Sequence, residues 1–195
     1  AGVGLLRRGV SGWGLLPATG RWLVGLVLLV VAWLALVQAH QIGVNFLLSV
    51  LVLVWAADVV AYFAGRAFGG RLFRVKLAPA ISPGKTWEGA LGGFVGVLLM
   101  AALWLVWDRA HPGLEPSLHT RLWARGWWFA LPAWAFLTAM SVVGDLVESL
   151  VKRSAGVKDS SGLLPGHGGV LDRVDALLPT LPLAMMLWSW LELRA

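Results

Sequence analysis

The sequence of residues 22–57 is WLVGLVLLVVAWLALVQAHQIGVNFLLSVLVLVWAA, a run of 36 residues without Asp, Glu, Lys or Arg. As one α-helix this run would be about 54 Å long, whereas the hydrocarbon core of a bilayer is about 30 Å thick. A short polar stretch, 38–45, with Gly43 inside it, marks a turn near the middle. We therefore predict two membrane-crossing helices, 21–39 and 42–65, joined by a tight turn.

Three further apolar runs, 89–107, 127–143 and 174–193, are each long enough to cross a bilayer as a helix. The chain of 195 residues is 58% hydrophobic and 13% charged, whereas soluble domains are about 45–50% apolar and about 25% charged. A bilayer around the helices explains this excess. We therefore predict an all-α integral membrane protein with about five transmembrane helices, folded as one membrane-embedded domain over residues 1–195.

Proline and tryptophan refine this prediction. Pro179 and Pro182 should kink the last crossing, and such kinks are tolerated in membrane helices. The sequence has 13 Trp and one Tyr, and indole rings favour the boundary between membrane and water. Core packing is the alternative for any single Trp. Six of them lie near the ends of apolar runs: Trp22, Trp107, Trp127, Trp128, Trp188 and Trp190.

Composition also limits the chemistry. The chain has no cysteine, which excludes disulfides, thiolate catalysis and cysteine-based metal sites. Its net charge of +6 suits phosphorylated substrates or an anionic membrane surface. The first residue is Ala and no pattern of a cleavable signal peptide follows, so we expect a processed or truncated chain.

The basic residues predict an orientation. With five crossings, the N-terminus and the loops 66–88 and 145–173 share one side of the membrane. That side holds 12 of the 16 Lys and Arg residues, and the other side holds four. Basic loops face the cytoplasm under the positive-inside rule, where nucleoside triphosphates are also found. We expect the bacterial inner membrane, with the charged loops in the cytoplasm.

The end of the fourth crossing carries the densest group of charges. Asp145, Glu148 and Lys152 are spaced three and four apart, so they share one face of a helix. A charge at membrane depth costs about 2.5–3.5 kcal/mol on insertion scales, so such groups are rarely without a function. The alternative is a solvated helix end held by a pair between Glu148 and Lys152.

A glycine-rich loop follows this helix. Gly168 and Gly169 let the backbone approach a ligand, and their amides can bind anions. The 26-residue loop returns the chain so that Asp145 and Asp172 lie at adjacent ends of antiparallel helices. Two facing carboxylates favour a cation between them, and Mg²⁺ prefers oxygen ligands together with substrate phosphates. His167 is a base, a phosphate donor or a turn residue.

The loop 66–88 forms a second cluster. Asp58, Tyr62 and Arg66 are spaced four apart and line one helix face before it. Ser82 followed by Pro83 predicts the start of the third crossing, with Ser82 as N-cap, and Lys85 beside a helix N-terminus would bind an anion. The alternative is a simple cap with basic residues at the membrane surface. A P-loop is rejected because its first glycine is missing and no strand precedes it.

Five elements of the sequence occur together: Ser149, Lys152-Arg153, Lys158-Asp159, His167-Gly168-Gly169 and Asp172-Arg173-Val174-Asp175. In their order and spacing they resemble the signature of the phosphatidate cytidylyltransferases, also called CDP-diacylglycerol synthases. The resemblance extends from about Asp58 to Pro179, with the interval 108–126 uninformative. It implies that CTP and phosphatidate are converted to CDP-diacylglycerol and pyrophosphate. Family members are typically longer at the N-terminus, so we expect this chain to be the C-terminal catalytic part.

The resemblance also implies site residues and cofactors. Asp145 and Asp172 would bridge Mg²⁺, with K⁺ implicated in a paired-metal site. Catalytic neighbours would be Lys152, Lys158, Asp159, His167, Arg173 and Asp175. Together with the second cluster, the expected substrate-binding residues are Asp58, Tyr62, Arg66, Ser82, Lys85, Thr86, Glu88, Glu148, Arg153, Gly168 and Gly169. The expected partners are the two substrates and the bilayer, with no nucleic acid and a homodimer as a possible assembly.

Two other functions are open at this point. A related CTP-dependent enzyme, such as an isoprenoid alcohol kinase or an ether-lipid cytidylyltransferase, would use the same charged residues. An ion transporter would instead place ionisable groups at the middle of several helices. Here the charges gather at the helix ends, and the middles carry residues such as Asn45 or Thr138.

Overall fold

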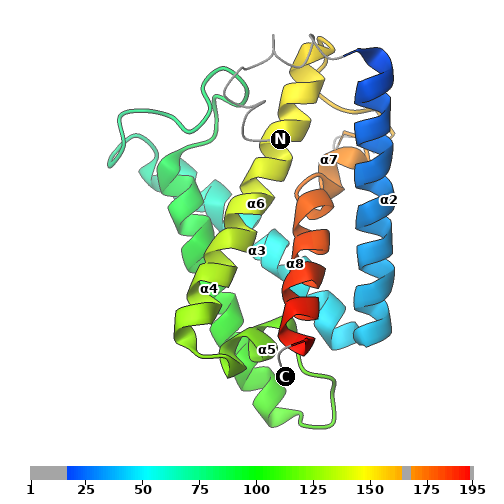
Figure 1. The fold of residues 1–195 in the computed structure, drawn as a ribbon. Coiled ribbons are helices and arrows are strands. Elements are labelled where there is room, and N and C mark those ends of the chain that lie inside the picture. Colours follow the sequence, from blue (N-terminus) through cyan, green and yellow to red (C-terminus); the bar gives the residue numbers. More distant parts are fainter. Residues whose placement is uncertain (1–16, 164–167, 194–195) are drawn as a thin grey trace.

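The computed structural model describes residues 17–163 and 168–193. Five long helical segments run back and forth across the molecule (Figure 1). They are α2 (Ala18–Ile42), α3 (Val44–Phe68), α4 (Trp87–Ala110), α6 (Trp127–Ser154) and the pair α7 (Leu171–Val174) and α8 (Leu177–Glu192). All five segments are long and apolar enough to span a membrane, and the described residues form no strand beyond an isolated bridge. The predicted all-α class with five crossings is confirmed.

Three details differ from the sequence-based ranges. The fourth crossing, α6, continues to Ser154, so its charged residues lie within the helix. A short amphipathic helix, α5 (Leu118–Ala124), fills the interval that the sequence left without an assignment. The last crossing is broken at Asp175 between α7 and α8. Pro179 lies four residues after this break, and a proline ring conflicts with the carbonyl four residues before it, so the kink predicted for Pro179 is confirmed. Pro182 lies inside α8, which continues through it.

Helices α3 and α4 pack closely because small residues face each other. A side chain at Gly92 would place its Cβ 2.2 Å from the Cβ of Ala64, and one at Gly93 would lie 2.7 Å from the carbonyl oxygen of Ala57. Without a hydrophobic driving force between helices in lipid, such close backbone contact is a principal source of helix association. This packing fixes Asp58 on α3 relative to the loop that precedes α4.

The outer surface of the bundle is apolar. Trp22 is 80% exposed and Leu26 is 60% exposed, and long aliphatic side chains of α2 continue this surface. A soluble protein rarely exposes so large a continuous apolar area. The exposed surface therefore fits lipid contact, and the chain is an integral membrane protein.

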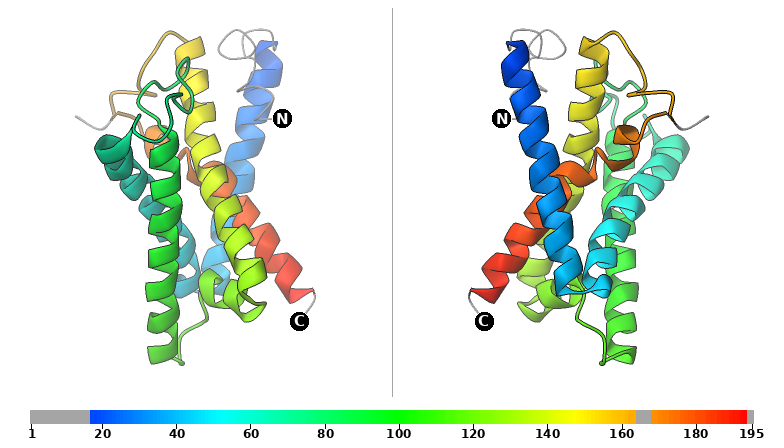
Figure 2. Two further views of the ribbon diagram at one scale, coloured as in Figure 1. Left: turned by 90° about the vertical axis from the view of Figure 1, so that its left-hand side faces the viewer. Right: turned by 90° about the vertical axis from the view of Figure 1, so that its right-hand side faces the viewer.

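The charged loops gather at one end of the bundle. The loop 69–86 and the described residues 155–163 and 168–170 lie at the same end as the start of α2, whereas α5 and the turn at Gly43 lie at the opposite end (Figures 1 and 2). This arrangement confirms the predicted grouping of the two basic loops on one side.

A polar network closes the opposite end. Asp108 of α4 accepts hydrogen bonds from Asn45 Nδ2, at 2.9 Å, and from Thr120 Oγ1, at 2.6 Å. Asn45 in turn accepts from the indole N–H of Trp104. These bonds tie α3, α4 and α5 together far from the charged loops. We assign this network a structural role, because its polar groups form hydrogen bonds with one another.

His119 of α5 makes the stability of the fold depend on pH. The ring is fully buried between Trp104 and Trp134, with Nε2 3.2 Å from the carbonyl oxygen of Ser49. Burial lowers the pKa of His119 from 6.5 to about 4, although the charge of Asp108 opposes this shift. The imidazole of His119 therefore binds a proton more readily in the unfolded chain than in the folded protein. The stability that depends on the neutral ring is fully present above about pH 6.5 and is lost as the pH falls towards 4.

We expect the free energy of unfolding to decrease by about 2 kcal/mol between pH 7 and pH 5 through His119 alone. His119→Phe should flatten this dependence, because an aromatic ring remains between the tryptophans while the titrating group is removed. Thermal unfolding in detergent at the two pH values measures the difference. An equal pH dependence in both proteins would contradict the role of His119.

Candidate active site

The charged face predicted for α6 is present at the loop end of the bundle. Asp145, Glu148 and Lys152 lie within α6. Asp145 takes part in one ion-pair cluster, and Lys152 is the centre of another. The two clusters lie side by side along one helix and bring together segments that are far apart in the sequence.

The first cluster surrounds Asp145. Lys85 Nζ lies 2.5 Å from Asp145 Oδ2, and Ser149 Oγ donates to Asp145 Oδ1 at 3.3 Å. Asp58 of α3 and Asp175 lie close enough to Asp145 and Lys85 for all of these charges to interact. Three carboxylates therefore interact electrostatically with one lysine, which leaves an excess of negative charge within this cluster.

Gly144 allows this cluster to form. A Cβ at this position would lie 2.7 Å from the carbonyl oxygen of Asp175 and 2.8 Å from Cγ of Pro179. Because glycine has no Cβ, the break between α7 and α8 can approach α6 at the level of Asp145. Asp175 then accepts a hydrogen bond from the amide of Ala176, which holds the carboxylate at the break.

We expect Gly144→Ala to lower turnover at least about tenfold, because a displacement of about 1 Å in a catalytic group can cost about 100-fold. The added methyl group must push Asp175 away from Asp145. Gly25→Ala in α2 is the matched control, since a Cβ there meets no atom within 4 Å. Both variants should appear in the membrane at normal levels, and equal activity of the two would show that the approach of α7 and α8 is not required.

The second cluster surrounds Lys152. Its Nζ lies 2.5 Å from Glu148 Oε2 and 2.5 Å from Asp172 Oδ1. Asp172 Oδ2 also accepts from the amide and hydroxyl of Ser160, at 2.9 and 2.8 Å, and from the amide of Gly169 at 2.6 Å. The glycine-rich loop is thereby folded onto Asp172.

The structure therefore pairs the two predicted metal ligands with different lysines. Asp145 pairs with Lys85, and Asp172 pairs with Lys152. The carboxylates whose charges act on Asp145 include Asp58 and Asp175, which the sequence had placed outside the metal site. In the part of the chain that the structure describes, no three Asp, Glu, His or Cys side chains could hold a metal ion by themselves.

The loop 69–86 corrects one prediction. Ser82 is not the N-cap of the third crossing, because α4 begins at Trp87 and Thr86 Oγ1 accepts a hydrogen bond from the amide of Gly89. Pro83 and Gly84 instead form a turn, in which the amide of Lys85 donates to the carbonyl of Ser82. Thr86, predicted to bind substrate, caps the helix and places Lys85 just before it.

Glu88 anchors the same loop from the first turn of α4. Its Oε1 accepts from the amides of Gly70, Leu72 and Phe73 at 2.9–3.0 Å. The side chain is almost completely buried, and its second oxygen, Oε2, has no hydrogen-bond partner. The three amides compensate the charge of the buried carboxylate through Oε1, whereas Oε2 accepts no hydrogen bond.

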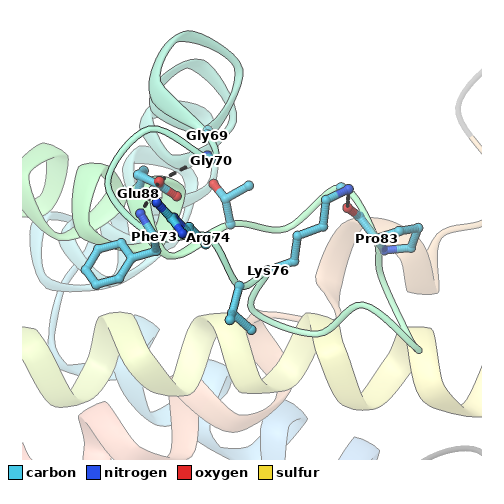
Figure 3. Close-up of a pocket in the computed structure, with 11 residues that line it drawn as sticks. Gly69, Gly70, Phe73, Arg74, Lys76, Pro83 and Glu88 are labelled. Carbon is cyan, nitrogen blue, oxygen red and sulfur yellow. Dashed lines mark hydrogen bonds between the residues drawn. The ribbon is translucent and has the colours of Figure 1, made fainter.

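A cavity of about 260 Å³ opens between this loop and the start of α4. Figure 3 shows Glu88 beside Gly70, Phe73 and Arg74, and Lys76 reaching to Pro83. Lys76 Nζ donates to the carbonyl of Pro83 at 2.8 Å. The wall also contains Gly84 and Thr86, the two neighbours of Lys85.

The other predicted residues lie around these clusters. Arg66 donates from Nη1 to the hydroxyl of Tyr62 at 3.2 Å, and both side chains are exposed. Arg153, Lys158, Asp159 and Arg173 are exposed near the glycine-rich loop. Gly168 lies against Asp172 Oδ2, where a Cβ would come within 2.8 Å. His167 lies outside the described residues. Ser160 was missed by the sequence reasoning, because its contact with Asp172 depends on how the loop folds.

Comparison with known proteins shows which family this chain resembles. A family model described as the cytidylyltransferase family matches residues 12–191. The chain is 43% identical to a phosphatidate cytidylyltransferase of Pseudomonas aeruginosa over 176 residues, which are 87% of this chain and 59% of that protein. It is 48% identical to that of Haemophilus influenzae over 72% of this chain and 44% of the relative, and 40% identical to that of Bacillus subtilis over 73% and 46%. The chain thus spans about half the length of the curated relatives it matches.

Proposed function

The chain belongs to the cytidylyltransferase family, and on this premise we propose that it transfers CMP from CTP to phosphatidate, giving CDP-diacylglycerol and pyrophosphate for phospholipid synthesis. Its relatives named phosphatidate cytidylyltransferase support this activity. The observation that carries the proposal is the cluster of Asp58, Asp145, Asp175 and Lys85 beside the cluster of Lys152. Both lie at the end of the bundle where a lipid head group and a nucleotide can meet.

The reaction requires positioning and charge compensation. An oxygen of the phosphatidate phosphate attacks the α-phosphorus of CTP, and the bond to the β-phosphate oxygen breaks to release pyrophosphate. Both reactants are anionic, so their repulsion and the charge on the leaving group form the main barrier. Phosphatidate is already ionised near neutral pH, so no strong general base is needed. We therefore assign His167 to phosphate contact and not to proton transfer.

The lysines have distinct roles in this proposal. Lys85, in the loop before α4, can exchange its ion pair with Asp145 for one with a phosphate of CTP, because its side chain is 23% exposed. Lys152 is held between Glu148 and Asp172. It sets the position of Asp172 and supplies positive charge next to the first cluster. The exposed Arg153, Lys158 and Arg173 attract the anionic substrates towards this end of the protein.

The residues around Asp145 fit a divalent cation. Three carboxylates with one lysine leave negative charge that Mg²⁺ would compensate, and Mg²⁺ is usually held by one or two carboxylates together with substrate phosphates. We propose Asp145 as the central ligand. Asp172 remains the second predicted ligand and would have to give up its contacts with Lys152, Ser160 or Gly169. When bound, the cation would reduce the repulsion between the phosphates and the charge on the leaving group. A paired K⁺ is part of the same proposal.

We further propose the bacterial inner membrane as the location, with the charged loops in the cytoplasm. The bacterial relatives support this location. The 12 basic residues that the sequence assigns to the loop side support the orientation. A homodimer is a compatible assembly.

The lipid acceptor distinguishes this proposal from its nearest alternative, a CTP-dependent enzyme acting on an isoprenoid alcohol or an ether lipid. The full-length protein, reconstituted in liposomes with CTP and Mg²⁺, should convert phosphatidate to CDP-diacylglycerol detected by mass spectrometry. Equal amounts of an isoprenoid alcohol and an ether-linked phosphatidate serve as competing acceptors. Preferential conversion of either competitor would contradict the proposed substrate.

A further inference from the structure

The cavity beside Glu88 has a feature that the proposed reaction does not use. The buried Oε2 of Glu88 has no hydrogen-bond partner, although the same carboxylate holds three backbone amides through Oε1. The anchoring of the loop needs one oxygen only. The other oxygen, Oε2, accepts no hydrogen bond and is covered by protein atoms, and Glu88 belongs to the wall of the adjacent cavity (Figure 3).

We infer that this cavity receives the pyrimidine base of CTP and that Glu88 Oε2 accepts a hydrogen bond from its 4-amino group. The inference rests on the proposed function and names the residue that selects the base. Glu and Asp accept hydrogen bonds from the amino group of cytosine, whereas uracil presents an oxygen acceptor at the same position. An ionised carboxylate has only acceptors, so it discriminates between the two bases.

The size of the cavity and the carboxylate of Glu88 in its wall favour a base over a phosphate. At about 260 Å³ it is slightly smaller than the range of about 300–1,000 Å³ typical of sites for drug-sized ligands, so it suits one ring and not a whole nucleotide. A lipid phosphate would place its negative charge next to the carboxylate of Glu88, which is unfavourable. Arg74 and Lys76 also line the cavity, and Lys76 Nζ is bonded to the carbonyl of Pro83.

The cavity lies next to Lys85, which reaches from the cavity wall to the cluster around Asp145. Gly84 and Thr86 belong to its wall, and Lys85 between them reaches Asp145 with an Nζ–Oδ2 distance of 2.5 Å. A base in the cavity would therefore leave its ribose and phosphates directed past Lys85 towards the cluster around Asp145. Oε2 is covered by protein atoms, so a base must displace wall atoms of the loop to reach it.

Glu88→Gln tests the recognition directly. The amide oxygen of the glutamine can keep the contacts with Gly70, Leu72 and Phe73, while its NH₂ group replaces the free acceptor with a donor. We expect the ratio of kcat/KM for CTP to kcat/KM for UTP to fall at least about tenfold, since one base contact of this kind discriminates by about 1–3 kcal/mol. The ratio does not depend on how much protein is folded. Glu192→Gln, at the opposite end of the bundle, is the matched control and should keep the ratio of the unchanged protein.

A second measurement works without altering Glu88. The chain contains no cysteine, and a Cβ at Gly84 or at Gly113 meets no atom within 4 Å. In the full-length protein, freed of any other cysteine, CTP should protect Gly84→Cys from maleimide labelling, whereas Gly113→Cys should react at the same rate with and without CTP. Inorganic triphosphate should protect Gly84→Cys less than CTP does.

The outcomes separate this inference from the proposed function. If the unchanged protein uses CTP but Glu88→Gln keeps the ratio, or if triphosphate or phosphatidate protects Gly84→Cys as well as CTP, the cavity is not the base site and the inference is overturned. If the unchanged protein transfers no CMP, the proposed function itself fails. A lowered ratio together with protection by CTP alone supports the inference.

Discussion

Asp145→Asn is expected to lower CMP transfer at least about 100-fold, a typical loss when a group that stabilises transition-state charge is removed. Asp145 forms an ion pair with Lys85 and accepts a hydrogen bond from Ser149. It also interacts electrostatically with Asp58 and Asp175. Asparagine keeps the size of the side chain but removes the charge that would hold a divalent cation. Initial rates with reconstituted full-length protein measure the effect.

The same substitution should leave the fold nearly unchanged. It removes one partly exposed ion pair with Lys85, worth at most about 1 kcal/mol. It also relieves the repulsion between Asp145 and the carboxylates of Asp58 and Asp175. We expect a melting temperature close to that of the unchanged protein, and Glu192→Gln serves as the control for activity. Activity retained at more than about a tenth of normal would show that the charge of Asp145 is not central to catalysis.

Lys152→Met is expected to affect stability as well as activity. The side chain of Lys152 is 17% exposed, and its ammonium group compensates Glu148 and Asp172, whose side chains are 6% and 10% exposed. Asp172 retains the donors of Ser160 and Gly169, whereas Glu148 loses its ion-pair partner. Removing one member of a buried pair costs about 3–5 kcal/mol, so the variant should unfold at a distinctly lower temperature.

A second substitution separates the two effects of Lys152→Met. Glu148→Gln in the same protein removes the buried charge that has lost its partner, so most of the lost stability should return. Activity should not return, because the positive charge next to Asp172 is still missing. Thermal unfolding and initial rates of the single and double variants provide the comparison. Restored activity in the double variant would show that Lys152 acts only through stability.

Helix content and topology could be predicted from the sequence because they depend on local features. The 36-residue uncharged run and the turn near Gly43 predicted two crossings, and the ends of α2 and α3 lie within three residues of the predicted ranges. Helix ends were less certain. Ser82 followed by Pro83 resembles a helix start, but α4 begins later, where the side chain of Thr86 caps the amide of Gly89. The short helix α5 has too few residues for a clear periodic pattern.

The candidate site was only partly predictable, since its partners come from distant segments. The spacing of Asp145, Glu148 and Lys152 on one face follows from helical periodicity, and the structure confirms it. The pairing of Lys85 with Asp145 depends on how α4 and α6 pack, which no local pattern encodes. The approach of Asp175 requires the missing Cβ of Gly144, a feature recognisable only in three dimensions.

The proposed transfer of CMP is tested most directly by labelling CTP at two positions. The full-length protein is incubated with phosphatidate, Mg²⁺ and CTP that carries ³²P at either the α- or the γ-phosphate. The proposal predicts that α-label enters the lipid product and that γ-label is released as pyrophosphate, with both signals lost in Asp145→Asn. Label from the γ-phosphate in the lipid, or no label in lipid from either position, would contradict it.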